Sequence, residues 1–346
     1  MSPVTADTPS PADRPVVAVL DPMPATSRQV IADIFGGEFT IRQADDDSAA
    51  AKRQVAADAT VLLTMYGAVD ADTIGAAPRT RVIQKLGVGT DKIDTGAAAG
   101  RGIVVLRAAG INADAVAELA VLLILADGRN LNRAMAAARS GQVEKELLRA
   151  ESFQLTGKTV GLLGLGHIGL AVARRLAPFG VTLAYHDLRR ADPATEAAVP
   201  IRYVPAEEII AGSDVISLHL PLTPATRNII GEQALGQVRP GLILVNTARG
   251  SLVDERALAK AIADGRVLGA GLDVTAEEPL PVTSPLHGLD RVVLTPHVGG
   301  AVANNFPRVI RHAYDNVRAV LGGGAVAEAD VVSWPGRDGG DGGPRR

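Results

Sequence analysis

The feature that most constrains how this chain can fold is a glycine-rich segment between Lys158 and Gly169. An apolar run over residues 160–163 predicts a buried parallel strand, and glycines follow it with G-x-G-x-x-G spacing. The first, Gly164, permits the tight turn out of the strand, Gly166 lets a pyrophosphate approach the backbone, and Gly169 lets the next helix pack closely. The N-terminus of that helix would offer free N–H groups to phosphates. The spacing therefore predicts a dinucleotide site, with a purely structural glycine turn as the alternative.

An acidic residue in the expected place supports the prediction of a dinucleotide site. A second apolar strand, Val181–Tyr185, ends just before Asp187. That acid lies about twenty residues beyond the first glycine, where such sites hold the ribose 2′-hydroxyl. Asp187 would repel a 2′-phosphate, although Arg189 and Arg190 could partly offset its charge, so we predict NAD as the cofactor. The further residues that we assign to cofactor binding are His167, Ile168, His219, Thr247, Ala248, Asp273 and Gly299.

Two of these assignments have an ordinary structural alternative. Asp273 could accept a hydrogen bond from the nicotinamide carboxamide, but its position at the end of a strand also suits a helix cap. His219 could line the cofactor site or be a structural histidine.

Composition sets the scale and excludes several functional classes. A chain of 346 residues is too long for one typical domain, and a net charge of −3 gives no basic field for nucleic acid or an anionic membrane. The absence of cysteine excludes disulfides and thiolate catalysis, and is compatible with the cytoplasm. No secretory signal is visible near the N-terminus, and the most apolar stretch, Ala115–Ala126, is too short to cross a bilayer.

The order of apolar runs predicts an α/β fold with two Rossmann-like doubly wound domains. Strands and helices alternate over residues 15–108, and about six further strands follow residue 158, so both sheets should be parallel. A long helix from Asn112 towards Ala138 would connect them, followed by a polar loop, Gly141–Gln154. A last helix, Ala303–Leu321, would return to the first domain. We therefore expect a discontinuous, flavodoxin-like substrate domain (15–110 and 301–325), a NAD-binding domain (111–300) and disordered tails (1–14 and 335–346).

Three charged or titratable residues follow strands of the second domain. Arg249, Glu278 and His297 each come after an apolar run, so they can converge on one edge of the sheet. An arginine can bind a carboxylate through two N–H bonds and polarise the neighbouring carbonyl. A histidine can give a proton to that carbonyl oxygen, and a carboxylate can orient the imidazole. Singly they could be a capping arginine, an acidic turn and a turn histidine; together they indicate a catalytic set acting with the cofactor. No cluster has metal-ligand spacing, so no metal is expected.

The first domain offers a candidate substrate site. Backbone N–H groups at Val88 and Gly89 can form an anion-binding nest for a carboxylate, although a plain turn is the alternative. Tyr66 and Gly67 follow another strand and would form a wall of the same site. Lys85 and Arg107 would supply charge for a phosphate, or be ordinary surface residues.

The motifs together resemble the D-isomer-specific 2-hydroxyacid dehydrogenases over about residues 15–322. The segments that carry the resemblance are Gly87–Asp91, Gly110–Asn112, Ala115–Glu118, Gly164–Gly169, Asp187, His219–Thr223, Asn246–Gly250, Val253–Asp254, Gly271–Pro279 and Thr295–His297. The resemblance implies that Arg249 binds and polarises substrate, that His297 is the acid/base and that Glu278 is its partner. It implies Asp187 on the adenosine ribose, Asp273 near the nicotinamide, and a homodimer formed through the cofactor domains with the long helix from Asn112.

The resemblance leaves the substrate and one alternative function open. The candidates are hydroxypyruvate or glyoxylate, 3-phosphoglycerate, or a bulkier keto acid. Because no further domain follows residue 322, we expect a form without a regulatory domain. The alternative function is a NAD(H)-sensing binding protein of the C-terminal-binding corepressor type, which shares the fold and the catalytic-like residues. Departures such as Ala108-Ala109, Leu119 and Thr275 bear on the subfamily and not on the catalytic set.

Overall fold

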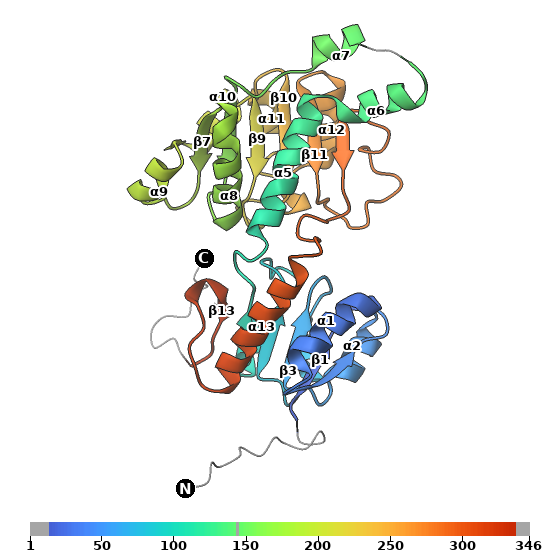
Figure 1. Ribbon diagram of the computed structural model, residues 1–346, viewed down its shortest axis with the longest axis vertical. Coiled ribbons are helices and arrows are strands. Elements are labelled where there is room, and N and C mark those ends of the chain that lie inside the picture. The colour runs from blue at the N-terminus through green and yellow to red at the C-terminus, as the bar shows by residue number, and fades with distance from the viewer. Residues whose placement is uncertain (1–13, 143–144, 337–346) are drawn as a thin grey trace. The chain divides into compact units, whose positions relative to one another are not determined.

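The computed structural model describes residues 14–142 and 145–336, which form two compact α/β units (Figure 1). Unit 1 takes the chain up to Asn112 and again from Ala303, and unit 2 is Ala113–Val302. The predicted fold class, two doubly wound domains of which one is discontinuous, is confirmed. The predicted tails lie almost entirely outside the described residues. Of the N-terminal one, Arg14 is described, and its Nη1 donates to the Gly36 carbonyl at 2.9 Å, so this residue is anchored.

Unit 1 is built on a six-stranded sheet with the order β13-β5-β4-β3-β1-β2. Its strands are parallel except β13, which pairs antiparallel with β5. Leaving out that edge strand, the order 2-1-3-4-5 is the flavodoxin-like one. The elements are β1 Val16–Val19, α1 Ala25–Phe35, β2 Thr40–Gln43, α2 Ala49–Ala56, β3 Val61–Thr64, α3 Ala71–Gly75, β4 Val82–Lys85, α4 Thr95–Gly100, β5 Val104–Leu106, α13 Phe306–Leu321 and β13 Val331–Ser333.

Apolar residues of unit 1 pack on both faces of this sheet. One cluster joins the sheet to α1 and α13, with Phe35 and Ile310 fully buried. The other packs residues such as Leu62 and Ile83 against the side that carries α2, α3 and α4. The fully apolar strand Val61–Leu63 is the expected pattern for a parallel strand covered on both faces.

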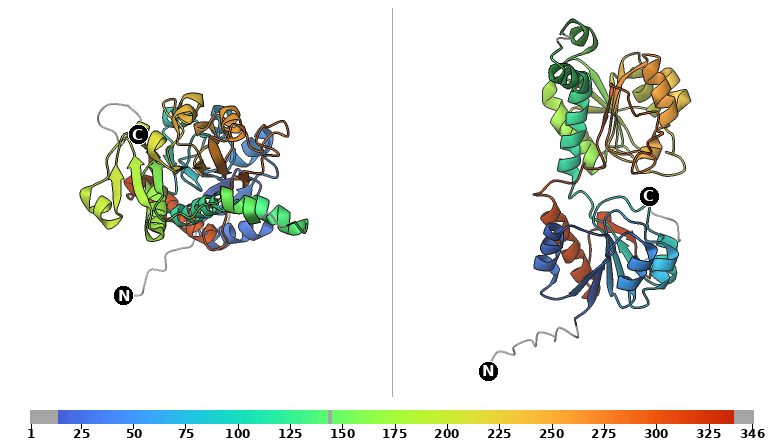
Figure 2. Two further views of the ribbon diagram at one scale, coloured as in Figure 1. Left: turned by 90° about the horizontal axis from the view of Figure 1, so that it is seen from above. Right: turned by 90° about the vertical axis from the view of Figure 1, so that its right-hand side faces the viewer.

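Unit 2 is built on a seven-stranded parallel sheet with the order β12-β11-β10-β9-β6-β7-β8. Helices cover both of its faces (Figure 2). The helices α5 and α8 pack together, and α11 contacts both α10 and α12. The strand order reverses beside β6, and ligands of such sheets bind beyond the carboxyl ends of the strands at that point. The elements are α5 Ala113–Gly128, α6 Leu131–Arg139, α7 Lys145–Glu151, β6 Thr159–Leu163, α8 His167–Leu176, β7 Thr182–His186, α9 Pro193–Ala198, β8 Ile201–Tyr203, α10 Ala206–Gly212, β9 Val215–Leu218, α11 Glu232–Gln237, β10 Leu242–Asn246, α12 Glu255–Ala263, β11 Val267–Leu272 and β12 Val292–Leu294.

Three sequence predictions about unit 2 are wrong. The sheet has a seventh strand, β8, whose three residues are too few to show periodicity. The predicted long connecting helix is two helices, because Asn130 has a left-handed backbone (φ 49°) between α5 and α6. The predicted polar loop at residues 141–154 contains the helix α7, which buries none of its side chains and so has no apolar stripe to reveal it.

In the part of the chain that the structure describes, no helix combines the length and the apolar character needed to cross a bilayer.

Candidate active site

The glycine loop has the geometry that a dinucleotide requires. Gly164 has a φ of 101°, and a Cβ there would lie 2.7 Å from the carbonyl carbon of His219, so a side chain is excluded both by conformation and by space. A Cβ on Gly169 would lie 2.2 Å from the Gly164 carbonyl oxygen. The lack of a side chain at Gly169 therefore allows α8 to approach the loop. At Gly166 a Cβ would meet nothing within 4 Å, and no side chain caps α8 there. The first turn of α8 is therefore open to a phosphate.

Asp187 follows β7 and contacts this loop. Its Oδ2 accepts a hydrogen bond of 2.8 Å from the backbone N–H of Leu165. No partner of its Oδ1 is found among the described residues. One carboxylate oxygen therefore fixes the acid against the glycine loop, and the other remains able to accept a ribose hydroxyl.

Two buried polar atoms at the ends of neighbouring strands also lack a partner within the described residues. His219 follows β9, and its Nε2 bonds the Ser217 hydroxyl at 3.0 Å while its Nδ1 is buried without a hydrogen bond. Burial lowers the pKa of His219 to about 4, so the ring is neutral at pH 7. The buried hydroxyl of Thr247, after β10, is likewise unpartnered. Buried polar groups normally have a partner, so these atoms fit a site that a polar ligand completes.

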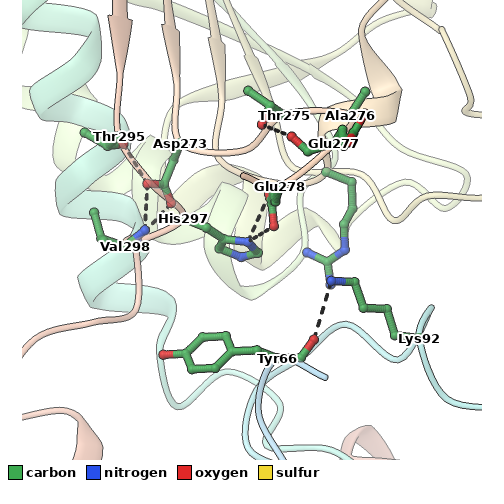
Figure 3. Close-up of polar contacts among 12 residues, drawn as sticks. Tyr66, Lys92, Asp273, Thr275, Ala276, Glu277, Glu278, Thr295, His297 and Val298 are labelled. Carbon is green, nitrogen blue, oxygen red and sulfur yellow. Dashed lines mark hydrogen bonds and ion pairs between the residues drawn. The ribbon is translucent and has the colours of Figure 1, made fainter. Parts of the chain in front are cut away.

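Asp273 organises the turn that carries His297 (Figure 3). This carboxylate is 2% exposed; its Oδ1 accepts from the Thr295 hydroxyl at 2.6 Å and from the Val298 N–H at 2.8 Å. Its Oδ2 accepts from the Gly299 N–H, also at 2.8 Å. The backbone N–H of His297 donates to the Asp273 carbonyl at 2.7 Å. Asp273 therefore anchors the following loop and does not cap a helix.

His297 and Glu278 form a direct pair. The Nδ1 of His297 lies 2.9 Å from Oε2 and 3.1 Å from Oε1 of Glu278, and Figure 3 shows the imidazole directed towards that carboxylate. Because an ionised carboxylate can only accept, Nδ1 carries a hydrogen and donates a hydrogen bond to Glu278. The arrangement leaves Nε2 as the ring atom for proton exchange, and the side chain of His297 is 45% exposed.

Arg249 lies in a turn held by a buried asparagine. The Asn246 side chain ends β10 at 0% exposure; its Nδ2 donates to the Arg249 carbonyl at 2.8 Å and its Oδ1 accepts from the Ala248 N–H at 3.0 Å. The Arg249 Nη1 donates to the Ala248 carbonyl at 2.6 Å. Asn246 thus fixes the backbone from which the guanidinium extends.

Strand order brings these residues to one edge of the sheet. Arg249 follows β10, Glu278 follows β11, and His297 follows β12. These strands are adjacent and parallel, so their carboxyl ends share one edge of the sheet. The glycine loop, Asp187 and His219 follow β6, β7 and β9 at that same edge. The other predicted cofactor residues, His167, Ile168, Ala248 and Gly299, lie in α8 or in these loops.

The loops after β3 and β4 contain the predicted substrate residues Tyr66, Gly67, Val88 and Gly89, whereas Lys85 ends β4 and Arg107 follows β5. Tyr66 is 57% exposed. Its pKa is raised, first by burial of the hydroxyl and second by the charge of Asp21. Within the described part of the chain, the N–H groups of Val88 and Gly89 have no hydrogen-bond partner. Lys85 Nζ donates to the Met65 carbonyl, and Arg107 Nε donates to the Ala329 carbonyl at 2.8 Å.

Sequence reasoning missed the residue that holds the loop after β3. Asp21 is 2% exposed, and its carboxylate accepts N–H bonds from Met65 at 2.6 Å, Tyr66 at 2.9 Å and Gly67 at 2.5 Å. The available signal was an acid directly after the apolar strand β1, beside the strand that leads to Tyr66. Its partners are backbone groups far along the chain, which no local pattern shows.

Comparison with known proteins decides the family. The model of the D-isomer specific 2-hydroxyacid dehydrogenase, NAD binding domain, matches residues 121–299. The chain belongs to this family. The matched stretch lies inside unit 2. Because the matching model is that of this family's NAD binding domain, the predicted resemblance and the predicted cofactor, NAD, are both confirmed.

Individual relatives carry names from the same family. The D-3-phosphoglycerate dehydrogenase of Mycobacterium leprae is 37% identical over 336 residues, which is 93% of this chain and 62% of that protein. The hydroxypyruvate reductase of Thermotoga maritima is 42% identical over 243 residues, covering 70% of this chain and 78% of that protein. The structure of the NAD-dependent formate dehydrogenase from Staphylococcus aureus in complex with NAD matches with a TM-score of 0.82 at 27% identity, covering 93% and 99% of the two chains. The chain spans less than two thirds of the phosphoglycerate dehydrogenase from M. leprae.

Proposed function

We propose that this chain is an oxidoreductase that interconverts a 2-keto acid and a D-2-hydroxy acid with NAD(H). The observation that carries the proposal is the His297–Glu278 pair, with Nδ1 and Oε2 2.9 Å apart, at the sheet edge that also bears the glycine loop. A dinucleotide site alone would fit many reactions, whereas an oriented imidazole at that edge supplies the proton that a carbonyl reduction needs.

The chemistry assigned to each residue follows from its atoms. Arg249 would bind the substrate carboxylate with parallel N–H bonds and polarise the adjacent carbonyl. His297 would deliver its Nε2 proton to the carbonyl oxygen, and remove it in the reverse direction. Glu278 holds the Nδ1–H and stabilises the imidazolium form. NADH, when bound, supplies the hydride. Asp273 would either accept from the nicotinamide carboxamide or act through the His297 turn, as its three internal donors indicate.

The cofactor residues that we propose lie around the glycine loop and the neighbouring strand ends. Asp187 would hold the adenosine ribose, and the first turn of α8 would hold the pyrophosphate. The open face of Gly166 and the unpartnered atoms of His219 and Thr247 support this placement.

The loops after β3 and β4 in unit 1 are the proposed substrate-binding segments. The N–H groups of Val88 and Gly89, which have no partner among residues 14–142 and 145–336, support a carboxylate there, with Tyr66 and Gly67 beside it. The substrate class is hydroxypyruvate, glyoxylate or a 3-phosphoglycerate-like acid, because relatives with these activities in their names match most of the chain. Unit 1 would thus be the substrate domain (15–110 and 301–325) and unit 2 the NAD-binding domain (111–300).

We also propose a homodimer and a cytoplasmic location. The exposed apolar side chains of α5, α6 and α7 support the dimer, as argued below. The cysteine-free composition is compatible with the reducing cytoplasm. The names of the relatives favour the enzyme over a corepressor-type NAD(H) sensor.

The deciding experiment separates turnover from cofactor binding. NADH oxidation is measured with glyoxylate, hydroxypyruvate, pyruvate and phenylpyruvate, and 3-phosphoglycerate oxidation with NAD. His297→Ala should lower kcat by about 10²–10⁴-fold, while NADH binding, followed by fluorescence, stays intact. His287→Ala is the matched control, because His287 is an exposed histidine of the same unit whose imidazole bonds only the Pro281 carbonyl among the described residues. Unchanged turnover in His297→Ala would exclude His297 as the acid, and no turnover with any substrate would favour the sensor.

A further inference from the structure

A compact ion-pair cluster lies just beyond the acid that ends β7. Arg190 donates through Nε to Oε1 of Glu196 at 2.9 Å and through Nη2 to Oε2 at 2.8 Å. Tyr185 donates its hydroxyl to the same Oε1 at 2.7 Å. The Glu196 side chain is 14% exposed, whereas that of Arg190 is 65% exposed. The carboxylate is therefore the fixed member of the pair, and it holds the guanidinium in a fork-to-fork contact.

Glu196 is fixed from several sides. Tyr185 is fully buried in β7, and its hydroxyl also accepts the N–H of Ala191 at 2.8 Å. The helix α9, which carries Glu196, is capped by Asp192 through the Thr195 N–H at 2.9 Å. Hydrogen bonds from Arg190 and then Tyr185 lower the pKa of Glu196 to about 2, so it is ionised throughout the neutral range.

The cluster stands next to the proposed ribose position. The carbonyl of Asp187 accepts a hydrogen bond of 3.3 Å from the Tyr203 hydroxyl, and the Arg190 guanidinium lies 5.9 Å from the centre of that same ring. Asp187 in turn contacts the glycine loop through Leu165. Arg190 thus lies one aromatic ring away from the acid that we assign to the 2′-hydroxyl.

An arginine in this place would ordinarily favour NADP. A guanidinium binds a phosphate through two parallel N–H bonds, and an arginine near this ribose accommodates a 2′-phosphate. Here two of its N–H donors are already engaged by Glu196. We propose that Glu196 is a specificity-determining residue, which favours NAD(H) over NADP(H) by holding Arg190 away from the 2′-position. Asp187 repels the 2′-phosphate, and Glu196 keeps the Arg190 guanidinium, which would attract that phosphate, in an ion pair.

The inference rests on the proposed function only through its dinucleotide site, so it is tested by binding without substrate. Dissociation constants of NADH and NADPH are measured by fluorescence titration. Glu196→Gln, which keeps the size of the side chain but removes its charge, should lower the ratio Kd(NADPH)/Kd(NADH) roughly ten-fold, the worth of one charge-assisted contact. Arg190→Ala alone should change the ratio by less than about two-fold, because Glu196 already holds the guanidinium away from the 2′-position.

Matched variants separate release of Arg190 from a general change in charge. Glu208→Gln removes the same charge from another exposed pair of this unit, Arg202–Glu208 at 2.7 Å, and should leave the ratio unchanged. The gain of Glu196→Gln should vanish in the double variant with Arg190→Ala and persist in the double variant with Arg189→Ala.

A further variant covers the case in which Glu196→Gln fails to fold. Tyr185→Phe removes the hydroxyl from Glu196 and should shift the ratio in the same direction by a smaller factor. An unchanged ratio in a folded Glu196→Gln, or a gain that survives loss of Arg190, would overturn the inference. Loss of keto-acid turnover with intact NADH binding would instead overturn the proposed chemistry and leave this inference standing.

Discussion

At the scale of single residues, the site depends on a histidine held in an unusual backbone conformation. His297 has a φ of 53°, a left-handed geometry that costs a non-glycine residue about 1–2 kcal/mol. Asp273 offsets this cost, because its carboxylate accepts hydrogen bonds from Thr295 and Val298, and its carbonyl accepts the N–H of His297 itself. The backbone conformation of His297, and not side-chain packing alone, therefore directs the imidazole towards Glu278.

The Glu278 carboxylate should matter for kcat more than for substrate binding. Glu278→Gln keeps a hydrogen-bond acceptor for Nδ1 but removes the charge that stabilises the imidazolium, so kcat should fall by about 10–100-fold with a smaller change in KM. Steady-state kinetics with the best keto acid measure this. Glu277→Gln, one residue away, should behave as wild type, since the hydrogen bond that Glu277 accepts from Thr275 uses its backbone carbonyl. Equal effects of the two substitutions would contradict a specific role for Glu278.

Asp127 is another buried carboxyl group, and it should make stability depend on pH. It lies on α5 at 5% exposure, its Oδ2 has no hydrogen-bond partner in the described chain, and burial raises its pKa to about 8. The folded state therefore keeps a proton that the unfolded state releases near pH 4. Stability should fall as the pH rises between these two values, by on the order of 1 kcal/mol per pH unit.

Asp127→Asn, which imitates the protonated acid, should remove that dependence. Its Tm relative to wild type should rise steadily from pH 5.5 to pH 8 in thermal unfolding followed by circular dichroism. Asp45→Asn changes an exposed carboxyl and should leave the slope as it is. Parallel Tm curves for wild type and Asp127→Asn would show that Asp127 is already ionised in the folded state.

At the scale of elements, the loop after β3 depends on the end of β1. The buried Asp21 carboxylate accepts three successive N–H bonds from this loop, and hydrogen bonds to a charged group are the stronger kind. Asp21→Asn replaces one acceptor oxygen by a donor that faces those N–H groups. The KM for the keto acid should rise roughly ten-fold with less change in kcat, while the Kd for NADH stays the same.

The control for Asp21 is an exposed acid with a similar local role. Asp46 accepts the Ser48 N–H at 2.8 Å, and Asp46→Asn should leave KM unchanged. If Asp21→Asn kept the wild-type KM, the loop after β3 would have no role in substrate binding.

The elements also show how far the sequence alone could lead. The strand β3 could be predicted from the sequence, because its apolar run Val61–Leu63 is typical of a strand buried on both faces. The strands β8 and β13 were missed, since each has three residues at the edge of its sheet. The residues of the proposed catalytic set were found because each follows a strand of apolar residues. The ion pair of Glu196 with Arg190 and the hydrogen bonds of Asp21 to the loop after β3 could not be predicted, because no local sequence pattern connects the residues in contact.

At the scale of the whole molecule, unit 2 carries an apolar surface that the described chain leaves uncovered. Leu122 on α5 is 55% exposed, Leu131 and Met135 on α6 are each 42% exposed, and Leu147 on α7 is 38% exposed. Leu131 and Met135 are four residues apart and share one helix face. The helix α7 buries none of its side chains within this chain. A second copy of the chain is the occupant that we propose for this surface.

Charge placed on this surface should break the dimer. Leu131→Glu combined with Met135→Glu puts two carboxylates where apolar contact is needed, so the mass in solution should fall from that of two chains towards that of one, 35.7 kDa. Light scattering coupled to size exclusion measures this mass at several protein concentrations. Val282→Glu adds charge at a 93% exposed side chain in the loop after β11 and should leave the mass unchanged. If the double variant kept the mass of two chains, the contact would have to lie elsewhere; if wild type were monomeric, the exposed face of α6 would need no partner copy.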